Sequence, residues 1–281
     1  MALTTDGGTR HDGPMSSSPR SQDDPAHQDF VDEFDGDDLD PTVWVRSYLP
    51  QWSSRAASAA TYVVRDSALH LMVPVDQGLW CPDDHDPLRV SGIQSGVFSG
   101  PVGSTVGQQP VREGSVVREA QETRWGWTPR FGRLEMRARM DLTARSMAAW
   151  WLVGLEDQPD RCGELCVVEV FGDAVTPGDA AVGLGVHPFR DPRLRDDFAA
   201  PRVAIDVRDF HTYAVDWTPQ GATFTVDDVV IRTVDLVPDY PMQSMVAVFD
   251  FPDRATPGDE AQAAHVPSLV VDRIGMGRAQ G

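Results

Sequence analysis

Hydrophobic and polar residues alternate along residues 131–141 of the chain. The apolar positions are Leu134, Met136, Ala138 and Met140, and the intervening positions are Arg133, Glu135, Arg137 and Arg139. A period of two residues is typical of a strand with one face in a core and the other in solvent. We therefore expect an antiparallel strand whose arginines lie on a solvated face beside neighbouring carboxylates.

Other segments have the same strand-like character. Residues 212–217 alternate in the same way, residues 148–155 form a continuous apolar run, and residues 223–234 predict a hairpin that turns at Asp227 and Asp228. Further short strands are expected at residues 68–73, 182–187, 245–251 and 269–274. Residues 74–130 are less regular, and we expect them to supply long loops at the edge of a cleft.

The pattern as a whole indicates an all-β fold, because hardly any segment has helical periodicity. The 281 residues include 24 Gly and 22 Pro, spread along the chain, which suits turns between many strands. A hydrophobic fraction of 41% with 8 Trp and 11 Phe is enough for a sizeable core. We predict one antiparallel β-sandwich of the jelly-roll type, spanning residues 30–281.

Charge and cysteine content exclude several classes of function. The net charge of −19 argues against binding nucleic acid or anionic membranes and is compatible with a neutral ligand such as a sugar polymer. The three cysteines, Cys81, Cys162 and Cys166, do not form a disulfide framework, and the C-x₃-C pair lacks a second pair to complete four metal ligands. No run of 18 apolar residues occurs, so no membrane partner is expected.

The first 29 residues are polar and rich in Ser, Asp, Gly and Pro. This composition predicts a disordered tail. The tail has no apolar segment of the kind found in signal peptides, so we expect a cytoplasmic protein, or a secreted one if the true start or the export route differs.

The segment from Cys162 to Gly172 carries the candidate chemistry, because Glu164 and Glu169 lie in a strongly β-prone run. Glutamate is seldom buried in a strand, whereas a pair of carboxylates facing a cleft is what glycoside hydrolysis requires. Residues i and i+5 of a regular strand point to opposite faces. Both carboxylates can share a cleft only if a β-bulge inserts one residue, which predicts a bulge near Val167 and Val168. The alternative is a regular strand with one Glu turned to solvent.

Five stretches, in order and spacing, resemble glycoside hydrolase family 16. They are residues 32–36 with Trp44, residues 131–139, residues 148–152, residues 163–169 and residues 211–219. The resemblance covers roughly residues 30–277 and implies a concanavalin A-like jelly roll whose concave sheet holds a polysaccharide. It implies Glu164 as the nucleophile and Glu169 as the acid/base of a retaining endo-glycosidase, with a β-1,3-glucan as the default substrate. A non-catalytic polysaccharide-binding module and a transglycosylase are the alternatives.

The chain departs from the family at one position. The family signature is Glu-x-Asp-x-x-Glu, and Cys166 stands where its central Asp is expected. A thiol is a weak hydrogen-bond donor and is usually neutral at pH 7, so it cannot supply the same coupling to the nucleophile. The enzyme would then tune Glu164 in another way, for example through His187 from an adjacent strand, or it would be slow or catalytically inactive.

Aromatic residues near these segments are candidates for stacking on sugar rings. The candidate substrate-binding residues are Trp125, Trp127, Trp150, Trp151 and His187. Trp150 and Trp151 are adjacent in a strand and therefore point to opposite faces, so one of them is expected in the core. Core packing is an equally good interpretation of Trp125 and Trp127.

The family resemblance also bears on cofactors. No cofactor is required, but a structural calcium ion recurs in the family away from the cleft. Glu33 and Asp272 lie near the matching ends of the chain. We expect a monomer whose partner is a polysaccharide.

Overall fold

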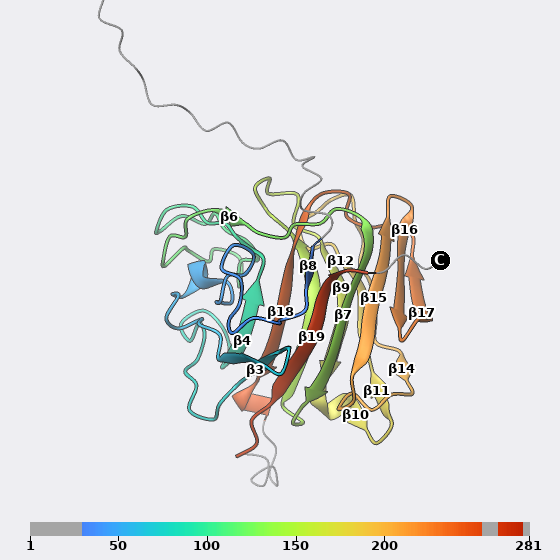
Figure 1. Cartoon of the computed structure of the whole chain (residues 1–281). Helices are drawn as coiled ribbons and strands as arrows, with labels where there is room; N and C mark the ends of the chain where they lie inside the picture. Colours follow the sequence, from blue (N-terminus) through green and yellow to red (C-terminus); the bar gives the residue numbers. More distant parts are fainter. Residues whose placement is uncertain (1–29, 255–263, 278–281) are drawn as a thin grey trace, which may run out of the picture.

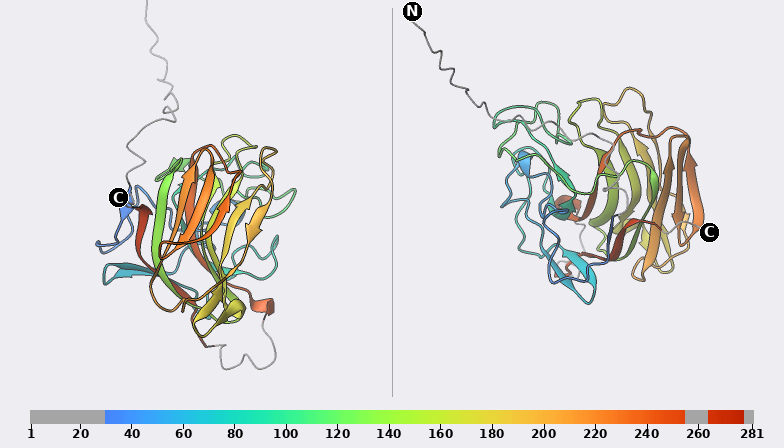
Figure 2. Two further views of the ribbon diagram at one scale, coloured as in Figure 1. Left: turned by 90° about the vertical axis from the view of Figure 1, so that its right-hand side faces the viewer. Right: turned by 45° about the horizontal axis from the view of Figure 1, so that its top comes forward.

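A computed structural model describes residues 30–254 and 264–277. The predicted disordered tail, residues 1–29, lies outside the described residues. The described chain is almost wholly β-structure, and all strand pairs in its sheets are antiparallel. Two large sheets pack face to face (Figure 1), as the two further views also show (Figure 2). The prediction of an antiparallel β-sandwich is therefore confirmed.

The first sheet has eight strands. In spatial order they are β17 (Val229–Val234), β16 (Gly221–Val226), β15 (His211–Thr218), β7 (Gly132–Asp141), β19 (Ser268–Met276), β3 (Ala68–Met72) and β2 (Tyr62–Arg65), with β1 (Val31–Asp32) paired to β19. The second sheet has six strands. They are β13 (Asp197–Ala199), β12 (Gly183–His187), β9 (Glu164–Phe171), β8 (Ser146–Gly154), β18 (Met242–Asp250) and β4 (Arg89–Gln94).

Smaller elements connect the sheets. A three-stranded sheet contains β10 (Val175–Thr176), β11 (Asp179–Ala181) and β14 (Arg202–Val203), and a ribbon pairs β5 (Gly96–Val97) with β6 (Arg124–Trp125). The described residues also contain three single-turn 3₁₀ helices: η2 (Pro50–Trp52), η3 (Gly172–Ala174) and η4 (Pro252–Arg254). Within the described ranges, no helix is long and apolar enough to cross a membrane.

The main core lies between the two sheets. The four apolar positions of β7 predicted to face inward are fully buried there, and Trp150 and Leu152 of β8 meet them from the other sheet. Each large apolar side chain that is removed from water stabilises the fold by roughly 1.5–3 kcal/mol. The opposite face of β7 is paired as expected, since Arg133 Nη1 lies 2.9 Å from Asp216 Oδ2.

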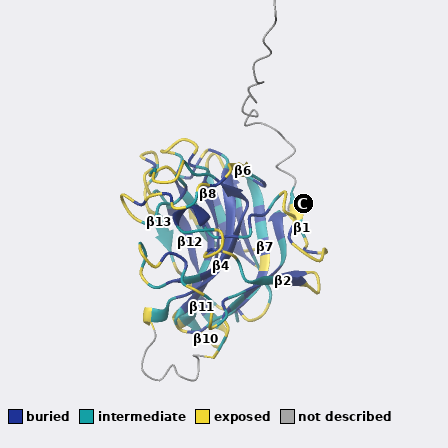
Figure 3. Cartoon of the chain, turned by 90° about the vertical axis from the view of Figure 1, so that its left-hand side faces the viewer, coloured by how far each residue is buried: buried dark blue, intermediate teal, exposed yellow. Residues whose placement is uncertain are grey.

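A second apolar cluster covers the outer face of the six-stranded sheet. Trp151, Met245 and Phe249 of the sheet pack there against Trp52 and Trp80 from the loops. The strands are largely buried and the exposed residues gather in the loops (Figure 3). The loops before β8 thus cover part of this face and leave the remainder of it as a cleft.

The predicted hairpin turn at Asp227 and Asp228 is confirmed, whereas one strand was not predicted. Asp227 and Asp228 have φ of +49° and +62°, the left-handed values of a tight two-residue turn between β16 and β17. Residues 89–94, expected in an irregular region, form β4 instead. The sequence pattern did not indicate this strand because it contains polar residues that are buried. Ser91 and Gln94 are fully buried, and Gln94 Oε1 accepts a hydrogen bond from the Leu49 amide at 2.8 Å.

Candidate active site

A β-bulge in β9 places the two glutamates on one face. In the ladder with β8, Trp150 pairs with Val168 and Trp151 pairs with Cys166, so Val167 is the extra residue. Val167 and Val168 both lie in the core between the sheets. The bulge required by the sequence is confirmed, and it reverses the alternation between Cys166 and Glu169.

The outer face of β9 therefore presents Glu164, Cys166 and Glu169 to the cleft. The cleft encloses about 280 Å³. Its remaining lining residues come from β8, from β18 and its end, and from loops: Tyr48, His85, Leu88, Gln109, Met147, Ala149, Trp151, Phe189, Phe249 and Phe251. Two carboxylates at the floor of an aromatic cleft can supply both an acid and a nucleophile to a bound ligand.

Burial and mutual repulsion shape the electrostatics of the pair. Burial, reinforced by the negative charge of Glu169, raises the pKa of Glu164 to about 8, and a hydrogen bond from Gln109 opposes this rise. Burial also raises the pKa of Glu169, against the opposing charges of His187 and Arg254. Glu164, with a pKa of about 8, therefore retains a proton near neutral pH, and burial also favours the protonated form of Glu169.

Cys166 contributes no charge between the two glutamates. Burial, and then the neighbouring charges of Glu164 and Glu169, raise the pKa of its thiol well above the usual range. The thiol donates a weak hydrogen bond to the Gly183 carbonyl, with Sγ 3.9 Å from the oxygen. Cys166 thus acts as a small neutral side chain on the cleft floor.

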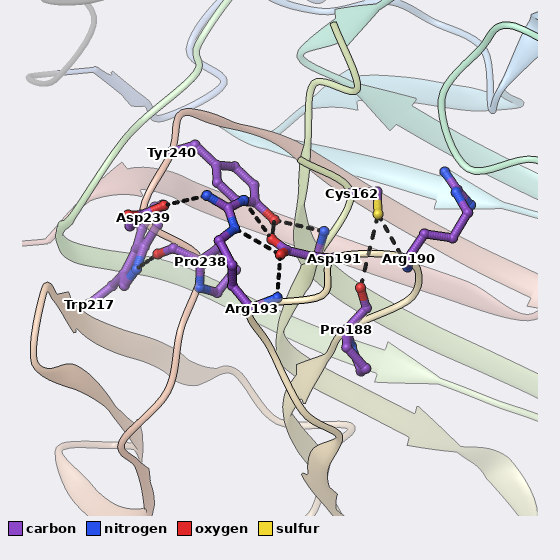
Figure 4. Close-up of polar contacts among 10 residues, drawn as sticks. Cys162, Pro188, Arg190, Asp191, Arg193, Trp217, Pro238, Asp239 and Tyr240 are labelled. Carbon is purple, nitrogen blue, oxygen red and sulfur yellow. Dashed lines mark hydrogen bonds and ion pairs between the residues drawn. The ribbon is translucent and has the colours of Figure 1, made fainter. Parts of the chain in front are cut away.

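A polar network fixes the start of β9 (Figure 4). The Tyr240 hydroxyl accepts a hydrogen bond from the Gly163 amide at 2.8 Å and donates one to Asp191 Oδ2 at 2.8 Å. Arg193 completes the network through two hydrogen bonds to the Asp191 carboxylate. A Cβ at Gly163 would lie 2.3 Å from Leu194 Cδ1 and 2.8 Å from the Tyr240 hydroxyl, so a larger residue would displace both side chains.

Cys162, directly before this glycine, is tied to the same loop. Its sulfur accepts a hydrogen bond from the Arg190 amide at 3.2 Å, and it lies 4.0 Å from the Pro188 carbonyl (Figure 4). All three cysteines are free and buried, in agreement with the sequence prediction. The two residues before Glu164 are therefore both fixed: Gly163 by Tyr240, and Cys162 by the backbone of Arg190.

The structure separates the candidate tryptophans. Trp151 lines the cleft, whereas Trp150 is fully buried in the core and donates through Nε1 to Ser244 Oγ at 3.0 Å. The prediction that Trp150 binds substrate is wrong, because its position on β8 points between the sheets. Trp127 is also a core residue and its ring centroid lies 5.1 Å from that of Phe30, so this prediction is wrong as well. Trp125 packs on Phe98 in the β5–β6 ribbon and is not among the residues that line the cleft.

His187 lies at the side of the candidate site. It pairs with Glu164 across the β9–β12 ladder, which puts its side chain on the cleft face. Its ring stacks on Phe198 with centroids 4.5 Å apart, and Nδ1 lies 2.7 Å from Asp196 Oδ1. These partners fix the ring beside the two glutamates.

Several lining residues were not identified from the sequence. Tyr48, Gln109 and Phe189 come from loops, where no periodicity indicates the direction of a side chain. Phe249 and Phe251 could have been found, because they alternate with the core positions of a predicted strand.

The predicted calcium ligands do not fit a metal site. Asp272 forms an ion pair with Arg137, and Glu33 Oε1 lies 3.7 Å from Arg273 Nε. Each carboxylate therefore already faces a cation, which disfavours a second positive charge. Among the described residues, no group of three or more His, Cys, Asp or Glu is arranged to hold a metal ion.

Comparisons with known proteins agree with this architecture. The structure is similar to the GlcNAcα1-4Gal releasing endo-β-galactosidase from Clostridium perfringens, with a TM-score of 0.73, 22% identity, and coverage of 92% of this chain and 64% of that chain. This chain therefore spans slightly less than two thirds of that protein's length. Laminarinases from Rhodothermus marinus and Flavobacterium sp. UMI-01 are also similar. For the first the TM-score is 0.58, with 18% identity and coverage of 87% and 94% of the two chains. For the second it is 0.56, with 16% identity and coverage of 87% and 97%.

Comparisons of the sequence alone match only part of the chain. No curated protein sequence matches the chain significantly. The sequence model of the glycosyl hydrolases family 16 matches residues 127–264, which include β7, β8, the bulged strand β9 and both glutamates. Over residues 127–264 the chain thus matches the glycosyl hydrolases family 16, and its fold is that of the solved glycoside hydrolases compared above.

Proposed function

We propose that the protein is a retaining endo-hydrolase of a neutral β-linked polysaccharide, with β-1,3-glucan as the first substrate to test. Glu164 is the nucleophile and Glu169 the general acid/base. The observation that carries the proposal is the bulge at Val167, which turns both carboxylates to one cleft. A regular strand would have turned one of them into the core.

The reaction proceeds in two displacements. In the first, a Glu164 oxygen bonds to the anomeric carbon while the bond from that carbon to the leaving oxygen breaks, and Glu169 gives its proton to the leaving oxygen. In the second, water attacks the same carbon and transfers a proton to Glu169, and the Glu164 carboxylate departs. Two inversions at one carbon restore the starting β configuration.

The protonation states support these roles. Burial raises the pKa of Glu169, and this direction favours the protonated form that a general acid needs. Glu164 must lose its proton to attack, and its pKa of about 8 makes this the more demanding requirement. The reaction is therefore expected to depend on whatever stabilises the charged form of Glu164.

The lining of the cleft supports a neutral substrate. Five aromatic side chains face the site, and aromatic rings suit the C–H faces of pyranose rings. They are Tyr48, Trp151, Phe189, Phe249 and Phe251. None of the described lining residues is an arginine, and the sequence contains no lysine. Arg254, which stacks on the Phe251 ring and whose charge acts on Glu169, is the cation beside this lining.

A second substrate class is a glycan with internal β-galactosides. It is favoured by the higher TM-score with the Clostridium perfringens endo-β-galactosidase than with the two laminarinases. A transglycosylase would use the same two glutamates, with a sugar hydroxyl in place of water. A binding module would not need both carboxylates in the cleft.

Reducing-end release from a panel of glycans tests the proposal. The panel contains a β-1,3-glucan, a mixed-linkage glucan, a β-galactoside glycan, xyloglucan, agar and carrageenan. We expect release from a neutral member by the wild type and none by Glu164→Gln. Glu135→Gln, a glutamate of β7 outside the cleft that pairs with Arg273, is the matched control and keeps the activity. Binding without release by both the wild type and Glu164→Gln would contradict the proposal.

A further inference from the structure

The Glu164 carboxylate receives its hydrogen bond from a loop rather than from its own strand. Gln109 Nε2 lies 3.2 Å from Glu164 Oε2, and Gln109 belongs to the segment between β5 and β6. In the described part of the chain, no other side chain donates a hydrogen bond to this carboxylate. Cys166, two residues along β9, donates instead to the Gly183 carbonyl.

The backbone of Gln109 is held in an unusual conformation. Its φ of +42° is left-handed, a conformation that is strained for a residue other than glycine. The Glu156 carboxylate accepts the Gln109 amide at 2.6 Å and forms an ion pair with Arg190. Glu156 is only 6% exposed, so a buried carboxylate secures this one position of the loop.

The preceding residue strengthens this attachment. The Gln108 carbonyl accepts hydrogen bonds from Gln51 Nε2 at 2.9 Å and from Trp52 Nε1 at 2.7 Å. The Gln108 side chain in turn accepts the Phe98 amide at 2.9 Å. Strained backbone persists where its surroundings over-determine it, and such positions are found at functional sites.

We propose that Gln109 is the positioning residue of Glu164 and that the buried carboxylate of Glu156 sets Gln109 in place. The inference rests on the proposed function, since it assigns Gln109 to the nucleophile of that reaction. Gln109 thereby supplies the hydrogen bond that Cys166 does not direct at Glu164.

The chemistry of the amide fits this role. A neutral N–H donor stabilises the charged form of Glu164 without adding a third charge to the cleft floor. A carboxylic acid at the same place would compete for the proton that the pair retains. Gln109 Oε1 is buried and has no hydrogen-bond partner, so the described contacts of this side chain are made through its Nε2 donor.

Glu156 is coupled to Gln109 through the backbone and not through the substrate. It does not line the cleft, whereas Gln109 does. Burial raises the pKa of Glu156 to about 7, and the Gln109 amide and Arg190 oppose this rise. A change at Glu156 reaches the reaction by moving Gln109 and its loop, or by moving Arg190, whose amide donates to Cys162 ahead of Glu164.

The test compares Gln109→Leu, Glu156→Gln and the double variant with the wild type, and uses Glu135→Gln as the control. For each protein, kcat and kcat/KM are measured against pH, and the side-chain carboxyl carbons of ¹³C-labelled glutamate are titrated by NMR. The Glu164 signal is assigned by its loss in Glu164→Gln.

We expect Gln109→Leu to move the acid limb of the profile up by about one unit and to lower kcat roughly tenfold below that limb, because a hydrogen bond to a charged group is lost. Glu156→Gln shifts the acid limb of the pH profile in the same direction by a smaller amount. In the Gln109→Leu background, Glu156→Gln causes no further shift of this limb. A purely structural role would lower stability without moving the limb.

The outcomes separate the two proposals. An active wild type whose acid limb and Glu164 titration are unchanged by Gln109→Leu overturns the inference and leaves the proposed function standing. A wild type that is inactive on every glycan refutes the proposed function. The NMR titration then decides by itself whether Gln109 governs Glu164, since a shifted titration supports that coupling and an unshifted one overturns it.

Discussion

Glu164→Gln is expected to stabilise the protein at alkaline pH while it abolishes the reaction. The folded protein raises the pKa of Glu164 from its ordinary value of 4.5 to about 8, through burial and the charge of Glu169. The folded state therefore holds a proton that the unfolded state releases. This contribution to stability is complete below pH 4.5 and is lost as pH rises through about 8.

The magnitude follows from the size of the shift. A difference of about 3.5 units, at about 1.4 kcal/mol per unit, gives a ceiling of about 5 kcal/mol between the acid and alkaline limits. Glu164 opens onto the cleft and is only partly buried, so we expect water to reduce this to about 2 kcal/mol. In a protein of this size that corresponds to roughly 4–8 °C in Tm.

The assay is urea unfolding at intervals from pH 5 to pH 9, with Tm as a second readout. The glutamine carries no titrating proton, so the stability of the variant falls less between the two limits than that of the wild type. We expect the two proteins to be similar near pH 5 and the variant to be the more stable by about 2 kcal/mol near pH 9. Glu135→Gln, on the far sheet, serves as the control and is expected to keep the wild-type dependence.

Parallel curves for the wild type and Glu164→Gln over this range would refute the reasoning. They would mean that Glu164 titrates alike in the folded and unfolded protein, and that neither burial nor Glu169 acts on it. The electrostatic basis of the proposed acid and nucleophile would then fail.

Three further predictions concern the surroundings of the pair. Tyr240→Phe removes the hydroxyl between Gly163 and the buried Asp191, so urea unfolding should show a loss of about 1–3 kcal/mol, and kcat should fall more than KM rises; unchanged stability would contradict this. Trp151→Phe should raise KM for the glycan, whereas Trp150→Phe should lower Tm and leave KM unchanged, and the reverse pattern would show that the cleft face is misassigned. Cys166→Ser should keep kcat/KM within about tenfold of the wild type, because one neutral hydrogen bond replaces another, and a complete loss would mean that the thiol itself reacts.

The fold was predictable where the pattern of side chains is set by the two faces of a strand. The alternation in β7 placed Met136 and Ala138 in the core, and the parity of Glu164 and Glu169 required the bulge at Val167. Both arguments depend only on a period of two residues. The family match then agreed with the segment that carries the pair.

The features that the sequence did not predict have a common physical cause. Their structure is determined by tertiary contacts and not by the local pattern of residues. β4 was missed because its buried Gln94 is satisfied by a hydrogen bond from a distant loop. Trp127 was a candidate for the cleft with core packing as an equally good interpretation, and the partner that decides for the core, Phe30, is far away in the sequence. Gln109 and Glu156 meet across 47 residues, so no local motif indicates their contact.

We propose that Glu164 and Glu169 cleave a β-linkage with retention. The most direct test is proton NMR of the first reducing ends formed from a hydrolysed glycan, before they mutarotate. We predict that the β-anomer appears first and that Glu164→Gln forms no product. An α-anomer as the first product would show that water attacks directly, and it would contradict the role of Glu164 as a nucleophile.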